Sequence, residues 1–280
     1  MTLGSTADLL DPCPGFRVRH IMTPKEEFRC VAASSNCNQV RKAAGPDFDC
    51  LPLCNGFRNV VGFVKVADLP KGGGPIPEEC VRRLLPEFTM DADAPLERAI
   101  GWLAQAPFQL VLSRKKVVGL ATASDLKKVP VLTVLFVRLA ELEMLLSRLI
   151  QNTYQNNEWR KYLDEKGKKR LDDRLDSARR DDLSVDPIHE VLLEDIADVV
   201  LGSEKLRRVL GLGSDGNSRD EVRLVVGLRN RVDHPTKPLL DRRYPVHRLA
   251  EAEQALERLL DRARQATGMS QVLPSDKHKT

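Results

Sequence analysis

The sequence has no long apolar run. Spanning a bilayer takes about 20 largely apolar residues, and the most apolar stretch, from Val131 to Ile150, contains several charges: Arg138, Glu141, Glu143 and Arg148. The sequence therefore predicts no membrane span. The first residues also lack the basic and apolar regions of a secretory signal, so we expect a cytoplasmic location.

Neither sign of charge is in large excess. The chain has 44 basic and 40 acidic residues, a formal net charge of +4, which does not by itself indicate a nucleic-acid partner. One local basic run contains Arg160, Lys161, Lys166, Lys168, Lys169 and Arg170. Such a run can face RNA phosphates or form a solvated helix face, and balanced charge around it favours the second interpretation.

Cysteines lack the spacing of a metal site. All six lie between Cys13 and Cys80, no Cys-x-x-Cys pair occurs, and His20 is the histidine near them. A zinc site needs better-spaced ligands, and a reducing cytosol disfavours a disulfide framework. We expect these cysteines to be small apolar side chains in strands and cores.

An internal repeat occupies the first half. Residues 60–69 match residues 117–126, so that Gly62 corresponds to Gly119 and Asp68 to Asp125 at a constant offset. In each copy an apolar segment and a turn precede this β-branched run, which predicts a β-hairpin. A helix starting near Pro95 precedes the second hairpin. We therefore predict two helix-strand-strand-helix repeats, forming an α/β domain.

Helical periodicity dominates the second half. After the flexible joint at residues 70–77 and a break at 127–130, apolar residues follow the helical repeat. The expected helices are a long one from Val131, then 162–180, one opened by Asp186 and Pro187, about 219–234, and 247–264. We expect an N-terminal segment (1–15), the α/β domain (16–128), an all-α bundle (131–264) and a disordered tail (265–280).

Two motifs in the first half resemble the CBS-domain family. They are Ile21-Met22-Thr23-Pro24 and the Gly-x-x-Thr-x-x-Asp pattern from Gly119 to Asp125. The resemblance covers residues 16–128. It implies a CBS pair that binds an adenine nucleotide such as AMP or ATP as a regulatory ligand, with Thr122 and Asp125 holding the ribose and phosphates.

The first copy departs from that pattern. Asp68 remains, but Lys65 stands where the threonine belongs. An aspartate at a helix start can accept hydrogen bonds from a ribose diol, and a lysine can meet a phosphate. Two alternatives stay open: both aspartates are only helix caps, or the pair is a scaffold without ligand. The sequence thus predicts an asymmetric sensor whose second site is the better one.

A short motif in the second half resembles the signature of HEPN domains. Arg229, Asn230 and His234 form Arg-Asn-x-x-x-His near the end of a predicted helix. The resemblance covers residues 131–264. It implies an all-helical, metal-independent endoribonuclease that cleaves RNA through attack of the 2′-OH, requires no cofactor, and works as a homodimer with two motifs across one cleft.

The chemistry of the motif suits that reaction. A histidine such as His234 can act as a general acid or base, and Arg229 can hold a phosphate. Asn230 and His234 are four residues apart, so we expect one shared helix face, with His234 in the last turn before Pro235. We assume no pairing for Asp233, which points elsewhere on a helix.

Other residues complete the predicted site. The resemblance implies an acidic residue on the first helix, which Glu141 or Glu143 can supply. Either can equally be a solvated helix residue. Some active relatives carry a tyrosine where this chain has Thr236, which weakens the case for those subfamilies. His189 has no supporting spacing and is expected on a helix surface.

The resulting hypothesis is an adenine-nucleotide-regulated, metal-independent endoribonuclease. Its predicted catalytic residues are Arg229, Asn230, His234 and Glu143. Its predicted ligand-binding residues are Thr122, Asp125, Asp68 and Lys65. The alternative is a non-enzymatic CBS-type regulator, in which the helical domain serves for dimerisation or docking.

Overall fold

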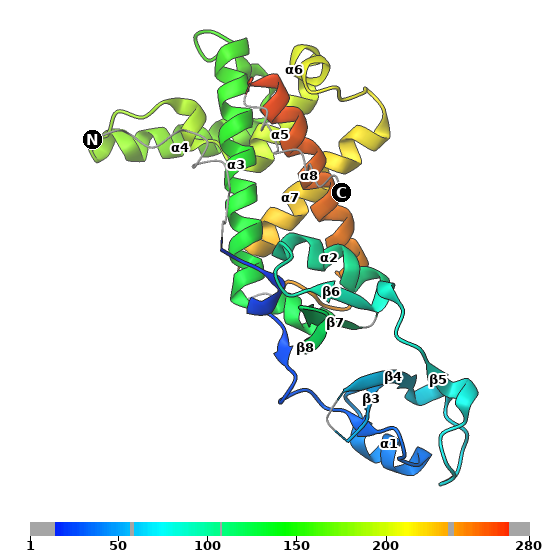
Figure 1. Ribbon diagram of the computed structural model, residues 1–280. Coiled ribbons are helices and arrows are strands. Elements are labelled where there is room, and N and C mark those ends of the chain that lie inside the picture. Colours follow the sequence, from blue (N-terminus) through cyan, green and yellow to red (C-terminus); the bar gives the residue numbers. More distant parts are fainter. Residues whose placement is uncertain (1–14, 57–58, 107, 235–237, 269–280) are drawn as a thin grey trace. The chain divides into compact units, whose positions relative to one another are not determined.

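The computed structural model describes residues 15–56, 59–106, 108–234 and 238–268, which form two compact units (Figure 1). The repeat unit consists of Gly15–Val131 with Leu240–His247. The helical unit consists of the described parts of Leu132–Leu239 and of the chain from Arg248 onward. Residues 1–14 of the predicted N-terminal segment and 269–280 of the predicted disordered tail lie outside the described residues, whereas the first residues of that tail, as far as Ala266, are helical.

The first copy of the repeat forms a four-stranded sheet in the order β2-β3-β4-β5. Its strands are β2 (Val31–Ala32), β3 (Cys50–Cys54), β4 (Val60–Lys65) and β5 (Val81–Arg82). The strands β3 and β4 are antiparallel, as the predicted hairpin requires, whereas β2 pairs with β3 in parallel. Periodicity in short β-branched runs thus located the central hairpin correctly.

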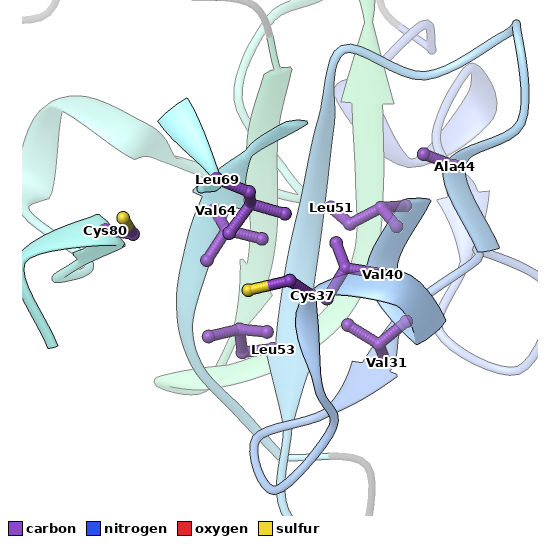
Figure 2. Packing of buried hydrophobic residues seen from close by; sticks show 9 residues of the cluster. All are labelled: Val31, Cys37, Val40, Ala44, Leu51, Leu53, Val64, Leu69 and Cys80. Atoms are coloured by element: carbon purple, nitrogen blue, oxygen red, sulfur yellow. The ribbon is translucent and has the colours of Figure 1, made fainter. Parts of the chain in front are cut away.

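Helix α1 (Cys37–Ala44) covers this sheet. Asn36 caps it: the Asn36 side chain accepts from the backbone N–H of Gln39, and Gln39 bonds back to the backbone of Asn36, each at 2.9 Å. This reciprocal cap satisfies two N–H groups at the helix start. Figure 2 shows side chains of α1, β3 and β4 converging on one apolar core, whose members are Val31, Cys37, Val40, Ala44, Leu51, Leu53, Val64, Leu69 and Cys80.

The second copy forms a sheet in the order β1-β8-β7-β6. Its strands are β1 (Thr23–Pro24), β6 (Thr89–Asp91), β7 (Phe108–Ser113) and β8 (Lys116–Thr122), and helix α2 (Leu96–Gln105) lies between β6 and β7. The β7–β8 hairpin closes through Arg114 and Lys115, with φ of 47° and 63°. Positive φ at both turn residues matches the twist of the flanking strands.

Each copy takes its edge strand from outside the predicted four-element unit. Strand β1 precedes the first copy yet pairs with β8 of the second, Thr23 opposite Leu120. Strand β5 pairs with β4, Arg82 opposite Phe63. Because Phe63 and Leu120 are equivalent in the repeat, Arg82 is the structural counterpart of Thr23.

The repeated glycines permit this edge pairing. A Cβ on Gly119 would lie 2.7 Å from the carbonyl oxygen of Thr23, and one on Gly62 would lie 2.8 Å from that of Arg82. Real Cβ atoms essentially never approach backbone so closely. The glycine of the repeat therefore serves the approach of a neighbouring strand in both copies.

Aromatic side chains join the two copies. Phe63 of β4 meets Phe108 of β7 edge to face with ring centroids 5.0 Å apart, and Phe88 stands 4.9 Å from Phe63. Phe63 and Phe108 are almost fully buried. Edge-to-face pairs at this spacing are favourable beyond their burial, so this cluster helps to hold the two sheets in one unit.

The helix expected after each hairpin is absent. The first copy ends in a 3-10 turn, Val66–Asp68, and the second in a 3-10 turn, Ala123–Lys127. Pro70 and the glycine run behind it cannot extend the first turn. Shorter 3-10 turns elsewhere in the unit span Val18–His20, Glu78–Cys80 and Pro86–Phe88.

The helical unit contains the long helices that periodicity predicted and one short helix, Glu204–Val209, that it did not predict. They are α3 (Val129–Thr153), α4 (Glu165–Arg180), α5 (Leu193–Gly202), α6 (Glu204–Val209), α7 (Gly216–Val232) and α8 (Val246–Ala266). Two 3-10 turns, Glu158–Tyr162 and Pro187–Glu190, join them. The helix expected from Asp186 is divided: its later part, with Ile196, Val199 and Val200, is α5, and its start is only the second of these turns. Asp186 caps it by accepting from the N–H of Ile188 at 3.1 Å, and α5 begins later.

Paired charges connect α3 to α8 inside the helical unit. Glu141 and Arg264 form a two-point ion pair at 2.8 and 2.9 Å, and their side chains are only 12% and 11% exposed. Arg138, 4% exposed, pairs with Glu253 at 2.5 Å and with Glu257. Two of the charges that interrupt the apolar run in the sequence, Arg138 and Glu141, are thus contacts between these two helices.

Candidate functional site

Thr122 and Asp125 lie together at the end of β8. The backbone N–H of Thr122 donates to Asp125 Oδ2 at 2.7 Å, and the Thr122 hydroxyl donates to the same oxygen at 3.0 Å. This contact caps the 3-10 turn Ala123–Lys127. The three-residue spacing of threonine and aspartate in the Gly-x-x-Thr-x-x-Asp pattern therefore allows Asp125 to cap this turn. The hydrogen bonds from Thr122 also hold the Asp125 carboxylate in place.

The other oxygen of Asp125 is also engaged. Lys128 Nζ lies 2.8 Å from Oδ1, and it donates to the carbonyl oxygen of Ile21 at 2.5 Å. The Asp125 side chain is only 9% exposed. A carboxylate has about four acceptor positions, so Asp125 retains capacity for a further donor. A ribose hydroxyl reaching Oδ1 would compete with Lys128.

The first copy has a different arrangement. Asp68 is exposed and pairs with Arg82 Nη2 at 2.7 Å, and Lys65 precedes the 3-10 turn without a side-chain cap. Arg82 is the counterpart of Thr23, so a cation occupies the position that a hydroxyl holds in the other copy. The predicted asymmetry extends beyond Lys65. The sequence comparison missed Arg82 because β5 belongs to no repeated segment.

Arg229 on α7 stands between two carboxylates. Its Nε lies 2.9 Å from Asp233 Oδ2 and 3.5 Å from Glu143 Oε1 of α3. Among the described residues, neither Nη atom of Arg229 has a hydrogen-bond partner. The charge of the guanidinium is thus offset by two acids that both approach its Nε.

Asp233 was not expected to pair, and that expectation is wrong. The two residues are one helical turn apart, at i and i+4, where side chains meet. The structure brings Glu143, the predicted acid of the first long helix, to the same arginine. Glu141, the other candidate, is instead occupied by Arg264.

Glu143 has a perturbed acidity. The pKa of its carboxyl is raised, mainly because the group is buried. The charge of Arg229 lowers this pKa and the charge of Asp233 raises it, but burial dominates. Desolvation disfavours the charged form of an acid. A carboxyl whose pKa is raised toward neutrality is suited to proton transfer.

Asn230 and His234 are exposed, but they do not share a helix face as predicted. Helix α7 ends at Val232 and Asp233 is its C-cap, so His234 lies beyond the helix. Pro235 explains this, because a proline disfavours helical geometry at the residue before it. Thr236 lies outside the described residues.

Most other sequence candidates have structural roles. Of the basic run, Arg160 pairs with Asp172, Lys168 with Glu165 and Arg170 with Asp195. His189 is exposed on the 3-10 turn Pro187–Glu190.

Of the cysteines that the structure describes, Cys37, Cys54 and Cys80 are buried, and Cys30 and Cys50 are partly exposed. Cys13 lies outside the described residues. Within the described ranges, no group of three or more His, Cys, Asp and Glu side chains is placed to hold a metal ion. No helix in the same ranges has both the length and the apolar character to cross a bilayer.

Comparisons with known proteins find likenesses in part of the chain. No protein-family model matches the sequence, and no curated protein matches it. Among solved structures, an uncharacterized conserved protein from Pyrococcus horikoshii has 27% identity, covering 39% of this chain and 88% of that one, with a TM-score of 0.33. CBSX2 in complex with AMP has 19% identity, covering 40% and 92%, with a TM-score of 0.34.

A third structure is the CBS domain of a bacterial CNNM/CorC family Mg2+ transporter in complex with ATP. It has 17% identity, covering 42% of this chain and 87% of that one, with a TM-score of 0.33. Over about 40% of its length, in the N-terminal part that holds the repeat, the chain is thus similar to solved structures that include CBS-domain proteins.

Proposed function

We propose that the repeat unit is a CBS pair that binds an adenine nucleotide as a regulatory ligand. The observation that carries the proposal is the arrangement of Thr122 and Asp125. A hydroxyl and a nearly buried carboxylate are fixed at the end of β8, with Lys128 beside them. The carboxylate supplies acceptors for a ribose diol and the lysine supplies charge for a phosphate.

The second copy is the better site. Asp125 keeps the complete pattern, whereas Asp68 is exposed and held by Arg82. Calorimetric titration with AMP and ATP tests the binding. Heat at micromolar to millimolar nucleotide that is lost in Thr122→Val supports the proposal. Absence of heat and of a thermal shift at millimolar nucleotide would instead favour a ligand-free scaffold.

We further propose that the helical unit is the effector, a metal-independent endoribonuclease of the HEPN type. Arg229 would hold the scissile phosphate through its two terminal nitrogens, and Asn230 would orient it. His234 and Glu143 would provide acid–base groups, because cleavage through the 2′-OH needs a proton acceptor and a proton donor. The raised pKa of Glu143 supports its assignment.

Pairing of two copies would bring two such centres together. Phe136 and Met144 of α3 are 54% and 68% exposed, and Met144 adjoins Glu143 in sequence. Phe136, Ala140 and Met144 are spaced four residues apart, so they follow one face of the helix. An exposed apolar face of this kind suits a homodimer.

Helix α3 is the natural link between binding and cleavage. Its first residues, Val129–Val131, group with the repeat unit and the remainder belongs to the helical unit. For a nucleotide to regulate cleavage, it must bind two states of the protein with different affinity. In this proposal α3 transmits that difference.

Cleavage of a labelled RNA in EDTA tests the catalytic assignment. The wild-type protein should yield a 2′,3′-cyclic phosphate, AMP or ATP should change the rate, and His234→Ala should lower it by at least about 100-fold. His189→Ala is the matched control, since that histidine is exposed and remote in sequence from the motif. Equal cleavage by the wild type and His234→Ala would remove the catalytic role.

One observation favours the non-enzymatic alternative. Arg229 has its charge offset by Glu143 and Asp233, and a paired guanidinium binds an added anion less strongly than a free one. In that case the Arg229 cluster would stabilise the α3–α7 contact of a regulatory or docking module. Full thermal stability with no cleavage, together with a dimer by light scattering, would select this alternative.

A further inference from the structure

In the second copy of the repeat, Lys128 closes the arrangement formed by Thr122 and Asp125. Its Nζ lies 2.8 Å from Asp125 Oδ1 and donates to the carbonyl oxygen of Ile21 at 2.5 Å. The Lys128 side chain is 43% exposed, whereas the Asp125 side chain is 9% exposed. The ammonium is therefore the accessible charge of the pair, and the carboxylate is the covered one.

The backbone brings Lys128 back toward Asp125. The 3-10 turn Ala123–Lys127 ends with the N–H of Lys128 donating to the carbonyl oxygen of Asp125 at 3.1 Å. The second acceptor is also fixed, because Ile21 is fully buried and its N–H donates to the carbonyl oxygen of Val18 at 3.0 Å. The turn thus places the lysine between two acceptors that are themselves held in position.

The first copy has the equivalent lysine but lacks this contact. Lys71 follows Asp68 by three residues, as Lys128 follows its own aspartate. The turn of the first copy ends at Asp68, and Pro70 has no N–H with which to extend it. Asp68 pairs with Arg82 instead, and Lys71 is exposed and forms no ion pair within the described ranges. The closed pair of lysine and aspartate thus distinguishes the second copy from the first.

The closed pair opposes a ligand that offers hydroxyl groups alone. A ribose diol that binds Asp125 Oδ1 must displace the Lys128 ammonium, which then keeps the Ile21 carbonyl but loses its counter-charge. Separating a partly buried ion pair without replacing the lost partner is unfavourable. An uncharged nucleoside brings no group that compensates the ammonium, so we expect it to bind weakly.

A 5′-phosphate on the ligand changes this balance. Its negative charge can replace the carboxylate beside Lys128, so the ammonium exchanges one anion for another while the diol binds Asp125. Lysine suits such an exchange, because its ammonium ends a flexible stem and has three donors that can reorient. Thr122 and Asp125 can stay joined throughout, since their hydrogen bonds use Oδ2 rather than Oδ1.

We propose that Lys128 makes the second-copy site selective for 5′-phosphorylated nucleosides over nucleosides without a phosphate. The inference rests on the proposed nucleotide site and identifies the residue that determines its specificity. Lys128 holds the Asp125 carboxylate closed, and a ligand releases it by bringing an anion of its own. The first copy has no such selection, because Lys71 is not paired with Asp68.

Calorimetric titration of the full-length protein with AMP and with adenosine tests the proposal. The wild type should bind AMP at least about tenfold more tightly than adenosine. Lys128→Met keeps the length of the side chain but removes its charge and its donors. This variant should bind AMP at least about tenfold more weakly than the wild type. It should bind adenosine equally or more tightly, because Asp125 Oδ1 is then open.

Lys127→Met is the matched control. It removes the same charge from the neighbouring residue, which is exposed and forms no ion pair within the described part of the chain, so both affinities should change by less than about twofold. Lys128→Arg retains the charge and should retain the preference for AMP. Thermal unfolding of each variant verifies that it folds. Should Lys128→Met fail to fold, Lys128→Gln replaces it, because glutamine keeps donors for both acceptors without the charge.

The outcomes separate this inference from the proposed function. Unchanged AMP binding in Lys128→Met, or an equal loss of AMP and adenosine binding, overturns the role of Lys128 while the nucleotide site stands. A wild type that binds adenosine as tightly as AMP overturns it as well. A wild type that binds neither compound removes the nucleotide site itself, and the inference with it.

Discussion

At the scale of single residues, the sites are defined by the partners of each charged group. Asp125 and Asp68 occupy equivalent places in the repeat, yet one is nearly buried against Thr122 and Lys128 and the other is exposed against Arg82. Arg229 pairs with two carboxylates, those of Glu143 and Asp233. Equal residue types therefore do not imply equal sites.

The raised pKa of Glu143 predicts how the stability of the protein changes with pH. Because burial raises its pKa above 4.5, the folded protein keeps this proton at pH values where the unfolded chain has lost it. The free energy of unfolding then falls as pH rises through that window. Glu143→Gln removes the cost of burying the charge and should be as stable as the wild type, or more stable, at pH 7.

Denaturant unfolding at pH 7 and pH 4 checks this. Any advantage of Glu143→Gln should shrink at pH 4, where the wild-type carboxyl is protonated. A variant that is less stable than the wild type by more than about 1 kcal/mol at pH 7 would show that the pairing with Arg229 outweighs burial. If Glu143 also acts in catalysis, the same variant should lose activity while it keeps its fold.

At the scale of elements, glycine has a precise role in the repeat. Gly119→Ala and Gly62→Ala should each lower the free energy of unfolding by about 1–3 kcal/mol, because the added Cβ meets the backbone of β1 or β5. Gly101→Ala is the matched control. Gly101 lies inside α2 with nothing within 4 Å of its Cβ position, so alanine there should stabilise by about 0.5–1 kcal/mol. Chemical denaturation compares the three, and equal effects would refute the steric explanation.

For the ion pair of Glu141 and Arg264 between α3 and α8, we expect a single substitution to destabilise the protein more than a double one. Glu141→Ala leaves the largely buried Arg264 with only its longer contact to Asp261, at 3.4 Å, and should cost about 3–5 kcal/mol. Glu141→Leu combined with Arg264→Met replaces the pair with apolar groups and should cost far less. Urea unfolding of both variants measures the difference. A double variant as unstable as the single one would contradict this account.

The hairpins and long helices were predictable because they arise from local periodicity. The edge strands β1 and β5 were not, since each has two residues, which is too short for a periodic pattern. The same limit applies to the sites: Thr122 and Asp125 are local, whereas Arg82 and the Glu143–Arg229 contact depend on tertiary packing. The pairing of Arg229 with Asp233 could have been predicted, because residues at i and i+4 meet on a helix. The position of His234 beyond the helix could also have been predicted, because Pro235 disfavours helical geometry at the residue before it.

At the scale of the whole molecule, the proposed function joins a sensor to an effector along one chain. In this proposal the repeat unit supplies a nucleotide site at Thr122 and Asp125, and the equivalent place in the first copy is altered. The helical unit supplies the cluster of Arg229, Glu143 and Asp233. Helix α3 belongs to both units by sequence. Any regulation by nucleotide depends first on nucleotide binding to the repeat unit, and this is the central claim.

Titration of the full-length protein with AMP, followed by calorimetry, tests that claim most directly. Asp125→Asn keeps an acceptor for the cap of Thr122 but loses the charge, and Asp68→Asn makes the same change in the first copy. We predict that Asp125→Asn weakens AMP binding by at least about tenfold, whereas Asp68→Asn changes it by less than about twofold. Equal affinity in the wild type and Asp125→Asn, or no binding by the wild type, would contradict the account.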